Sequence, residues 1–444
     1  MEYSEIFVKA VSLILSLSIL VLLHEAGHFI PARLFKTKVE KFYLFFDPWF
    51  SLFKFKRGET EYGIGWLPFG GYVKIAGMID ESMDKEAMKE PAQPWEFRSK
   101  PAWQRLIIMI GGVTVNALLA WAIYSMSLFT WGQEYLPVEN AKYGYAYDSL
   151  LLQNGFQDGD KILFVDTTKP KDTRDVTLMI MLDGKRNVTV DRNGEQKVIT
   201  LPADFHKTMM AEKKQALFQP RIPFVINDLI ADLPASKSGL QKGDQLIGID
   251  TVSTLYFSDF HTEILKHKKQ KVDLVVLRKA DTVHVKCDVT EEGIIGAVPQ
   301  SPVTFLETKK TEYGFFESIP AGLDVAVETL VGYVKQFKLI FTKEGASNLG
   351  SFGTLGSLFP DDFGPGYWEK FWGITALLSV ILAFMNLLPI PALDGGHVLF
   401  LLYEITFRRK PGEKFMEYAQ MGGMILLFAL MAFALFNDVV KFFF

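Results

Sequence analysis

The chain has 444 residues, 49% of them hydrophobic, and its formal net charge at pH 7 is −4. This hydrophobic fraction is high for a soluble protein, and the near-neutral charge gives no support for binding nucleic acid. A single cysteine, Cys287, excludes an intrachain disulfide framework. The composition therefore predicts a membrane protein with soluble parts.

The first predicted element is a membrane span. Residues from about Ile6 to Leu23 form an apolar run that is interrupted only by Lys9 near its start. A cleaved signal peptide is the competing interpretation. The start of the chain is acidic, however, and the run leads directly into His24-Glu25-Ala26-Gly27-His28. We therefore predict a retained span within residues 1–33.

The end of this span carries groups of the zinc-protease type. On a helix, His24 and His28 share a face, so both imidazoles can bind one metal ion. Zinc takes such ligands tetrahedrally and leaves a position open for water, whose proton Glu25 could accept and pass to a leaving amine. A structural trio is the alternative. Because ionisable groups in a span cost about 2.5–3.5 kcal/mol each, we favour a metal site.

Residues 34–105 are polar and rich in aromatic side chains, which predicts a cytoplasmic or re-entrant region. Within it, the stretch from Tyr62 to Ile75 reads as two short strands around a Pro/Gly turn, and so as a β-hairpin. It is either an ordinary surface hairpin or one that dips toward the metal, where its edge could pair with an extended substrate.

The second predicted span lies within residues 106–131 and contains Gly111, Gly112 and Asn116. Small residues allow helices to approach closely, and an asparagine inside a span usually has a hydrogen-bonding partner. For Asn116 we favour a role in helix packing over a role at the site.

The region that follows contains an internal repeat. Residues 154–166 are echoed by residues 238–250, each with a Gly-Asp turn that leads into an apolar strand. We predict two copies of a small α+β domain, 132–215 and 216–311, and each copy resembles a bacterial PDZ domain. Binding of peptide ends is one possible role. Pro223 weakens this role, because it removes an amide donor from the candidate carboxylate loop Arg221–Phe224. The other possible role is that of a bulky ring of protein that screens access to the membrane site.

A helical apolar stripe follows in residues 312–345 and predicts an amphipathic helix, either at the membrane interface or packed on a soluble core. The third span, in residues 346–405, is broken by Pro389 and Pro391 and leads to Asp394 in apolar sequence. With no Lys or Arg nearby, a metal ion is the economical partner of Asp394. His397, one helical turn later, is the rival ligand.

The last region, residues 406–444, contains a basic loop and a fourth apolar run. Because short basic loops stay cytoplasmic, the loop 408–414 and residues 34–105 are placed inside and the repeats outside. The predicted fold is a multi-pass α-helical membrane protein with four transmembrane helices. It carries a membrane-associated β-hairpin and two inserted extracytoplasmic PDZ-like α+β domains.

These motifs together resemble the site-2 protease family of intramembrane zinc metalloproteases, in particular its bacterial branch that regulates sigma factors. The resemblance covers nearly the whole chain. It rests on His24–His28, on Asn386 through Asp394-Gly395-Gly396, on Phe69–Val73 and on the paired PDZ-like domains. One departure is that family members commonly carry Gly-Pro-x-x-Asn in the second span, whereas Val113 replaces the proline here.

The resemblance implies roles for particular residues. It implies that His24, His28 and Asp394 bind Zn²⁺ and that Glu25 is the general base. Asn386 and the hairpin are then expected to hold an unwound substrate segment, the hairpin through Gly70, Gly71, Tyr72 and Val73.

The resemblance also implies a biological setting. The expected substrates are single-span membrane proteins of the anti-sigma-factor type and remnant signal peptides, cleaved after a first cut has trimmed the outer domain. The expected location is the bacterial inner membrane, with the PDZ-like pair on the periplasmic side. We expect a monomer in contact with the lipid bilayer and no nucleic-acid partner.

Two other classes of function compete. A membrane-anchored PDZ scaffold explains the repeats but leaves the ionisable groups in the spans without a task. A metal transporter would be expected to carry further ionisable residues on the second and fourth spans, which offer almost none.

Overall fold

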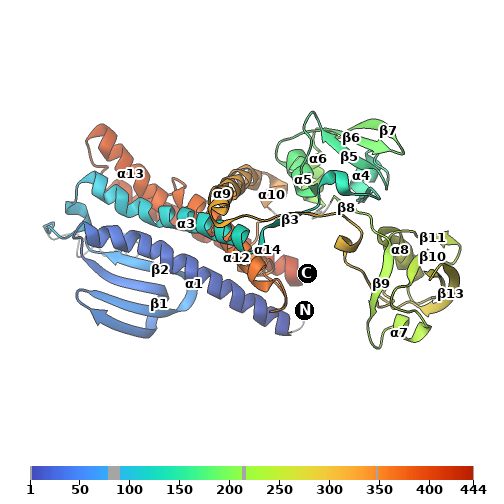
Figure 1. Ribbon diagram of the computed structural model, residues 1–444. Coiled ribbons are helices and arrows are strands. Elements are labelled where there is room, and N and C mark those ends of the chain that lie inside the picture. Colours follow the sequence, from blue (N-terminus) through green and yellow to red (C-terminus); the bar gives the residue numbers. More distant parts are fainter. Residues whose placement is uncertain (1–2, 79–90, 213–216, 347–348, 444) are drawn as a thin grey trace. The chain divides into compact units, whose positions relative to one another are not determined.

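The computed structural model in Figure 1 describes residues 3–78, 91–212, 217–346 and 349–443. The chain divides into two compact units. One comprises Met1–Gly132 and Glu312–Phe444, and the other comprises Gln133–Thr311. In sequence, the second unit is therefore an insertion into the first.

The first unit is mainly helical. Its helices are α1 (Tyr3–Leu34), α3 (Ala102–Trp131), α9 (Phe315–Phe337), α10 (Lys343–Ala346), α11 (Phe352–Gly356), α12 (Tyr367–Leu387), α13 (Asp394–Phe407) and α14 (Glu413–Phe443). Among the described residues, four helices are long and apolar enough to cross a membrane, namely α1, α3, α12 and α14. The prediction of four apolar spans is confirmed at this level. The spans are helical because a helix satisfies its own backbone groups in lipid.

Helix α3 packs against α1, α9, α12 and α13, so it joins the segments that precede the insertion to those that follow it (Figure 1). It approaches α1 closely. A Cβ atom added to Gly27 would lie 2.5 Å from the carbonyl oxygen of Gly111, and one added to Gly111 would lie 2.0 Å from that of Gly27. Only glycine at both positions permits this crossing, which brings the end of α1 against α3.

The first unit also contains a β-sheet made of β1 (Val39–Arg57) and β2 (Thr60–Ile75). Both strands bend, at Phe45 (φ 68°) and Trp49 (φ 75°) in β1 and at Gly70 (φ 141°) in β2. The register gives four paired segments in the spatial order 51–57, 60–67, 39–46 and 71–75.

This register corrects the prediction of a hairpin within residues 62–75. The two arms do not pair with each other, because residues 39–46 lie between them: Phe42 is paired with Tyr62 on one side and with Val73 on the other. The pattern of the local sequence could not show that an earlier segment would enter between the arms. Residues 71–75 form an edge of the resulting sheet.

Helix α9 lies on α3. Its buried Ser318 and Gly322 face the span, and the indole of Trp121 donates a hydrogen bond to the carbonyl of Ile319 at 2.8 Å. A Cβ on Gly322 would lie 2.3 Å from the hydroxyl oxygen of Ser125, so the contact is close. The opposite side of α9 leaves large apolar side chains exposed, including Phe316 at 82%.

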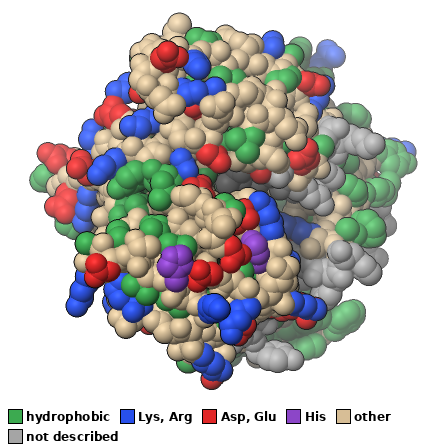
Figure 2. Space-filling view, turned by 90° about the vertical axis from the view of Figure 1, so that its right-hand side faces the viewer, with side chains coloured by type: hydrophobic (Ala, Val, Ile, Leu, Met, Phe, Trp, Pro, Cys, Tyr) green, Lys and Arg blue, Asp and Glu red, His purple; other side chains and the backbone are tan. Residues whose placement is uncertain are grey.

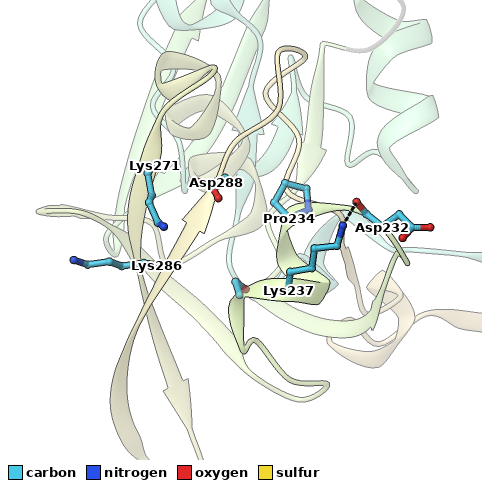
Figure 3. Close-up of a pocket in the computed structure, with 7 residues that line it drawn as sticks. Asp232, Pro234, Lys237, Lys271, Lys286 and Asp288 are labelled. Atoms are coloured by element: carbon cyan, nitrogen blue, oxygen red, sulfur yellow. Dashed lines mark hydrogen bonds between the residues drawn. The ribbon is translucent and has the colours of Figure 1, made fainter.

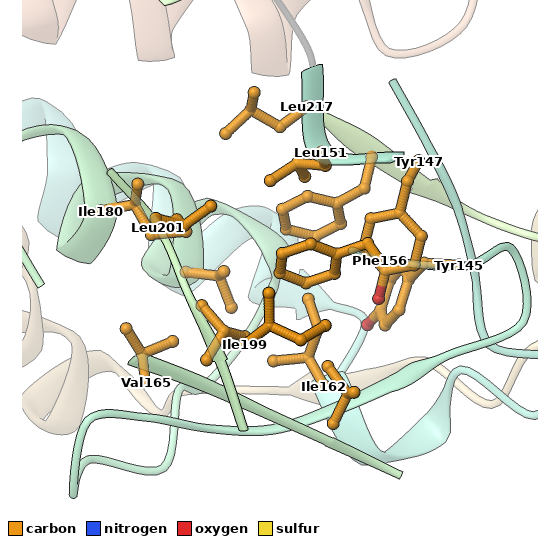
Figure 4. Close-up of a cluster of buried hydrophobic side chains, with 14 of the residues drawn as sticks. Tyr145, Tyr147, Leu151, Phe156, Ile162, Val165, Ile180, Ile199, Leu201 and Leu217 are labelled. Carbon is orange, nitrogen blue, oxygen red and sulfur yellow. The ribbon is translucent and has the colours of Figure 1, made fainter. Parts of the chain in front are cut away.

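The second unit has two hydrophobic cores. The first is enclosed by β4 (Tyr145–Tyr147), α4 (Ser149–Gln153), β5 (Lys161–Val165), α5 (Thr173–Met181), β6 (Asn187–Arg192), β7 (Glu195–Thr200), α6 (Phe205–Ala211) and β8 (Phe218–Pro220). Figure 4 shows its aromatic side chains, Tyr145, Tyr147 and Phe156, beside leucines and isoleucines. Strand β8, which follows the predicted boundary at residue 215, pairs with β4.

The second core is enclosed by β9 (Phe224–Leu229), α7 (Pro234–Ser238), β10 (Gln245–Ile249), β11 (Val252–Ser253), α8 (Phe257–Ile264), β12 (Lys271–Arg278), β13 (Asp281–Asp288) and β14 (Ala297–Pro299). Its sheet has the order β13-β12-β10-β9-β14, and β11 pairs with β10. Two further strands, β3 (Gln133–Tyr135) and β15 (Lys309–Thr311), pair with each other. They hold together the two ends of the insertion.

Each half of the second unit contains an equivalent ion pair between an arginine and a buried aspartate. In the first half, Arg192 donates to both carboxylate oxygens of Asp160 at 2.7 Å. In the second half, Arg278 donates to both oxygens of Asp244 at 2.8 and 2.7 Å. Each aspartate belongs to the Gly-Asp turn of the repeat. The repeated sequence therefore forms the same local structure twice. In each copy, a guanidinium group makes a bidentate salt bridge with a buried carboxylate.

Candidate metal centre

The candidate metal centre is built from the last turns of α1 and the first residue of α13. His24 and His28 lie one turn apart on α1, and their Nε2 atoms are 3.3 Å from each other. The rings meet edge to face, with centroids 4.9 Å apart. The helical spacing of four therefore turns both imidazoles toward one point.

Asp394 reaches that point because the chain turns sharply after α12. A Cβ on Gly395 would lie 2.2 Å from the carbonyl oxygen of Leu388, and one on Gly396 would lie 2.4 Å from Cα of Pro391. The two glycines allow α13 to begin directly against the loop that contains the prolines. As a result, Oδ2 of Asp394 lies 3.2 Å from Nε2 of His24 and 3.3 Å from Nε2 of His28.

This donor set fits a zinc ion. Two imidazole nitrogens and one carboxylate oxygen are common zinc ligands, and tetrahedral bonds of about 2.0–2.1 Å place neighbouring ligand atoms about 3.3 Å apart. Oδ2 of Asp394 is buried and makes no hydrogen bond. A buried anionic oxygen without a donor is costly, so a cation is its natural partner.

The rival ligand, His397, does not belong to this group. Among the described residues, the potential metal ligands that converge are His24, His28 and Asp394. His397 lies one turn into α13, where the residues on either side of it, Gly396 and Val398, are buried. The geometry therefore favours the carboxylate over the imidazole as the third ligand.

Helix α3 contacts both imidazoles. Nδ1 of His28 lies 2.8 Å from the carbonyl oxygen of Ile108, and Nδ1 of His24 lies 3.1 Å from Nδ2 of Asn116. The sequence interpretation favoured a packing role for Asn116. Its backbone carbonyl does accept a hydrogen bond from Ser379 at 2.7 Å, but its side chain faces His24. The spacing of four between Gly112 and Asn116, which puts both on one face of α3, was a signal for this role.

Glu25 lies beside the three candidate ligands and next to the edge of the sheet. Its carboxylate is close enough to His24, His28 and Asp394 to feel their charges, and it lies beside the backbone of Val73. A Cβ on Gly71 would approach Cγ of Glu25 to 3.3 Å. The side chain thus occupies the space between the ligand cluster and residues 71–75.

The residues predicted to bind substrate lie around this space. Nδ2 of Asn386, at the end of α12, is 3.4 Å from Nε2 of His24. Gly71 and Val73 face Glu25 as described above. The side chain of Tyr72 points elsewhere, because its hydroxyl donates to Asp47 at 2.8 Å and its ring stacks on Tyr43. Any contact of Gly70 or Tyr72 with a substrate would therefore use the backbone.

We predict that Gly112→Ala lowers zinc affinity by at least about tenfold. This is the lower end of the loss caused by mutating residues that orient metal ligands. The added Cβ would lie 2.4 Å from Nε2 of His28 and 2.8 Å from Nε2 of His24, so the rings would have to move apart. Competition with a chromophoric chelator would measure the change. Gly373→Ala on α12 is the matched control, because nothing lies within 4 Å of its added Cβ. Equal affinities in the two variants would contradict the prediction.

A model of peptidase family M50 matches residues 12–430 of the chain. The chain belongs to this family. Three relatives of this M50 peptidase illustrate the match. It is 29% identical to a candidate zinc metalloprotease from Neisseria meningitidis, over 96% of this chain and 98% of the relative. It is 27% identical to the regulator of sigma E protease of Haemophilus influenzae, over 97% of this chain and 98% of the relative. It is 28% identical to RseP of Salmonella typhimurium, over 96% and 97%.

The family membership confirms the expected enzyme class. The M50 peptidase is a zinc metalloprotease and, with four helices apolar enough to cross a bilayer among its described residues, a membrane protein. Its resemblance to site-2 proteases is confirmed along nearly its whole length.

The second half of the M50 peptidase's insertion contains a cavity of about 240 Å³. It is lined by Asp232, Pro234, Lys237, Ser238, Lys271, Lys286 and Asp288 (Figure 3). Three lysines and two aspartates nearly balance in charge, and Lys237 donates to the carbonyl of Asp232 at 3.4 Å. On the face in Figure 2, acidic and basic side chains are likewise interspersed. These features do not single out a ligand.

Proposed function

We propose that the chain is an intramembrane zinc endopeptidase that cleaves transmembrane segments of single-span membrane proteins. Its substrates are of the anti-sigma-factor or remnant signal-peptide type, cut in regulated intramembrane proteolysis after a first cleavage has trimmed the outer domain. The observation that carries this proposal is the convergence of His24, His28 and Asp394 beside Glu25, on helices that are apolar enough to cross a bilayer.

In this proposal His24, His28 and Asp394 hold the ion. When bound, zinc supplies a Lewis acid that polarises the scissile carbonyl and lowers the pKa of a water molecule toward about 7. Glu25 accepts the proton of the attacking water and delivers it to the leaving amide nitrogen. Its position beside the cluster and next to the Val73 backbone supports this role.

A helical substrate must be unwound before its amide can be attacked, and its freed backbone groups then need new partners. The edge segment 71–75 supports strand addition because it borders Glu25 and is paired on one side only, with residues 39–44. Nδ2 of Asn386 lies 3.4 Å from Nε2 of His24. We propose that the backbone of Gly70, Gly71, Tyr72 and Val73 and the amide of Asn386 hold the extended substrate across the site.

We propose the type of substrate from the names of the relatives, and the orientation in the membrane from the basic residues of one loop. Two of the relatives are named regulators of sigma E protease, which supports a substrate of the anti-sigma-factor type. The basic run Arg408–Lys410 precedes α14, and short basic loops remain in the cytoplasm. We therefore propose that the insertion between α3 and α9 lies on the outer side of a bacterial inner membrane.

We propose that the insertion is a pair of PDZ-like domains that limits access by size. Peptide-end capture at Arg221–Phe224 has little support, because this segment is engaged with α8. Arg221 donates to both oxygens of Asp259 at 3.0 and 2.9 Å and covers the ring of Tyr256 at 3.9 Å. A pair of domains that excludes bulky substrate domains by size does not need a pocket for a peptide end.

We predict that deleting residues 138–299 broadens cleavage to substrates with an intact outer domain. Strands β3 and β15 remain and pair with each other, so a short linker can close the gap. Cleavage of an intact and a trimmed substrate would be compared in the full-length and deleted proteins. The trimmed substrate is the internal control, because its cleavage should persist. If the deleted protein still discriminates as strongly as the full-length one, the size filter is wrong.

The function itself is tested by co-expression with candidate single-span proteins. Cleavage by the wild type, its loss with Glu25→Gln and its loss on chelation of zinc in the purified protein are expected. A zinc-containing protein that cleaves none of a broad panel, yet moves zinc across vesicles, would indicate a transporter instead. A protein without zinc would indicate a scaffold.

A further inference from the structure

We infer that Asn116 is a positioning residue that fixes the tautomer and orientation of His24 by accepting its Nδ1–H. The side chain of Asn116 is fully buried, at 0% exposure, in the middle of α3. Its carboxamide nitrogen position lies 3.1 Å from Nδ1 of His24. A buried polar side chain with this contact is directed at the site by the fold and cannot reach solvent.

The chemistry of the imidazole decides which way the carboxamide points. A neutral imidazole that offers Nε2 to a metal carries its proton on Nδ1, and Nδ1–H then needs an acceptor. The oxygen and nitrogen of a carboxamide have nearly the same shape, so a 3.1 Å contact suits either orientation. Only the orientation that presents Oδ1 to His24 leaves Nε2 free for the ion.

The second histidine shows the same arrangement with an unambiguous partner. Nδ1 of His28 lies 2.8 Å from the carbonyl oxygen of Ile108, which can only accept. Both rings therefore direct Nδ1 toward α3 and Nε2 toward Asp394. A backbone carbonyl orients one imidazole, and the side chain of Asn116 does the same for the other.

The spacing along α3 explains why an asparagine is needed. Ile108, Gly112 and Asn116 follow each other at intervals of four and so share one face. Gly112, in the middle, has no side chain and admits both rings. At the third position the backbone carbonyl is occupied, because it accepts the hydroxyl of Ser379 on α12. The side chain must then supply the acceptor for His24.

Zinc affinity of the purified full-length protein tests this inference. Asn116→Leu keeps the size but removes the acceptor, and it is expected to weaken zinc binding by about 10–100-fold, as changes to such outer partners do. Asn116→Asp retains an acceptor and has no N–H to present, so its affinity should stay within about threefold of the wild type or be tighter. The affinity is measured by competition with a chromophoric chelator.

Two further measurements separate positioning from a packing role. Ser379→Ala removes the hydrogen bond to the Asn116 backbone but leaves its side chain in place, so thermal stability should fall while zinc affinity stays the same. The visible spectrum of the cobalt-substituted protein should change in Asn116→Leu and remain unchanged in Ser379→Ala. If Asn116→Asp weakens zinc binding as much as Asn116→Leu, or if neither does, the inference is wrong.

This inference rests on the proposed assignment of His24 as a ligand, and the experiment distinguishes the two failures. If the wild type binds no zinc, or if His24→Ala binds it as tightly as the wild type, the proposed site itself fails. If His24→Ala loses zinc while Asn116→Leu binds normally, only the role of Asn116 fails.

Discussion

Replacing Glu25 with glutamine is expected to stop cleavage of a membrane-helix substrate while the protein keeps its zinc. Glutamine has the size of glutamate but cannot accept the proton of the attacking water. The loss should be about 10²–10⁴-fold, the usual contribution of a general base. Because Glu25 is not one of the three converging donors, the metal content should stay near one ion per chain in the wild type and the variant.

The measurement combines metal analysis with a cleavage assay on the same preparations. Glu5→Gln is the matched control, because it makes the same change on the same helix about five and a half turns away. It should cleave like the wild type. Full turnover by Glu25→Gln would refute the base assignment, and loss of zinc from this variant would instead give Glu25 a role in holding the ion.

The second large effect is expected at Asp394. Asp394→Asn should release zinc from the purified protein, because it removes the anionic oxygen that lies 3.2 and 3.3 Å from the two histidine nitrogens. The drop in zinc affinity should exceed the roughly 10–100-fold loss caused by mutating residues that hydrogen-bond to metal ligands. Two neutral imidazoles and a carboxamide are a poorer site for a dication than two imidazoles and a carboxylate.

His397→Ala is the control for this variant, since it removes an imidazole from the same helix one turn away. It should retain zinc at the wild-type level. The reverse pattern, with zinc kept by Asp394→Asn and lost by His397→Ala, would make His397 the third ligand and would require α13 to begin in a different orientation.

The local sequence determined the features that depend on neighbours along the chain. Four apolar runs predicted four helices, because each run by itself sets the length and the apolar character of its helix. The spacing of His24 and His28 predicted that their rings converge, since residues four apart share a helix face. The repeated Gly-Asp turn was visible because each copy builds its own turn.

The tertiary structure decided what depends on contacts between distant segments. Asp394 and His397 both suited the third position, and only the packing of α13 after its tight turn brought the carboxylate to the rings. Residues 39–46 entered between the two arms of β2, because a strand edge pairs with whichever segment the fold brings to it. Asn116 took its place at the site for the same reason. A helix pattern shows which residues share a face, but it does not show which helix that face meets.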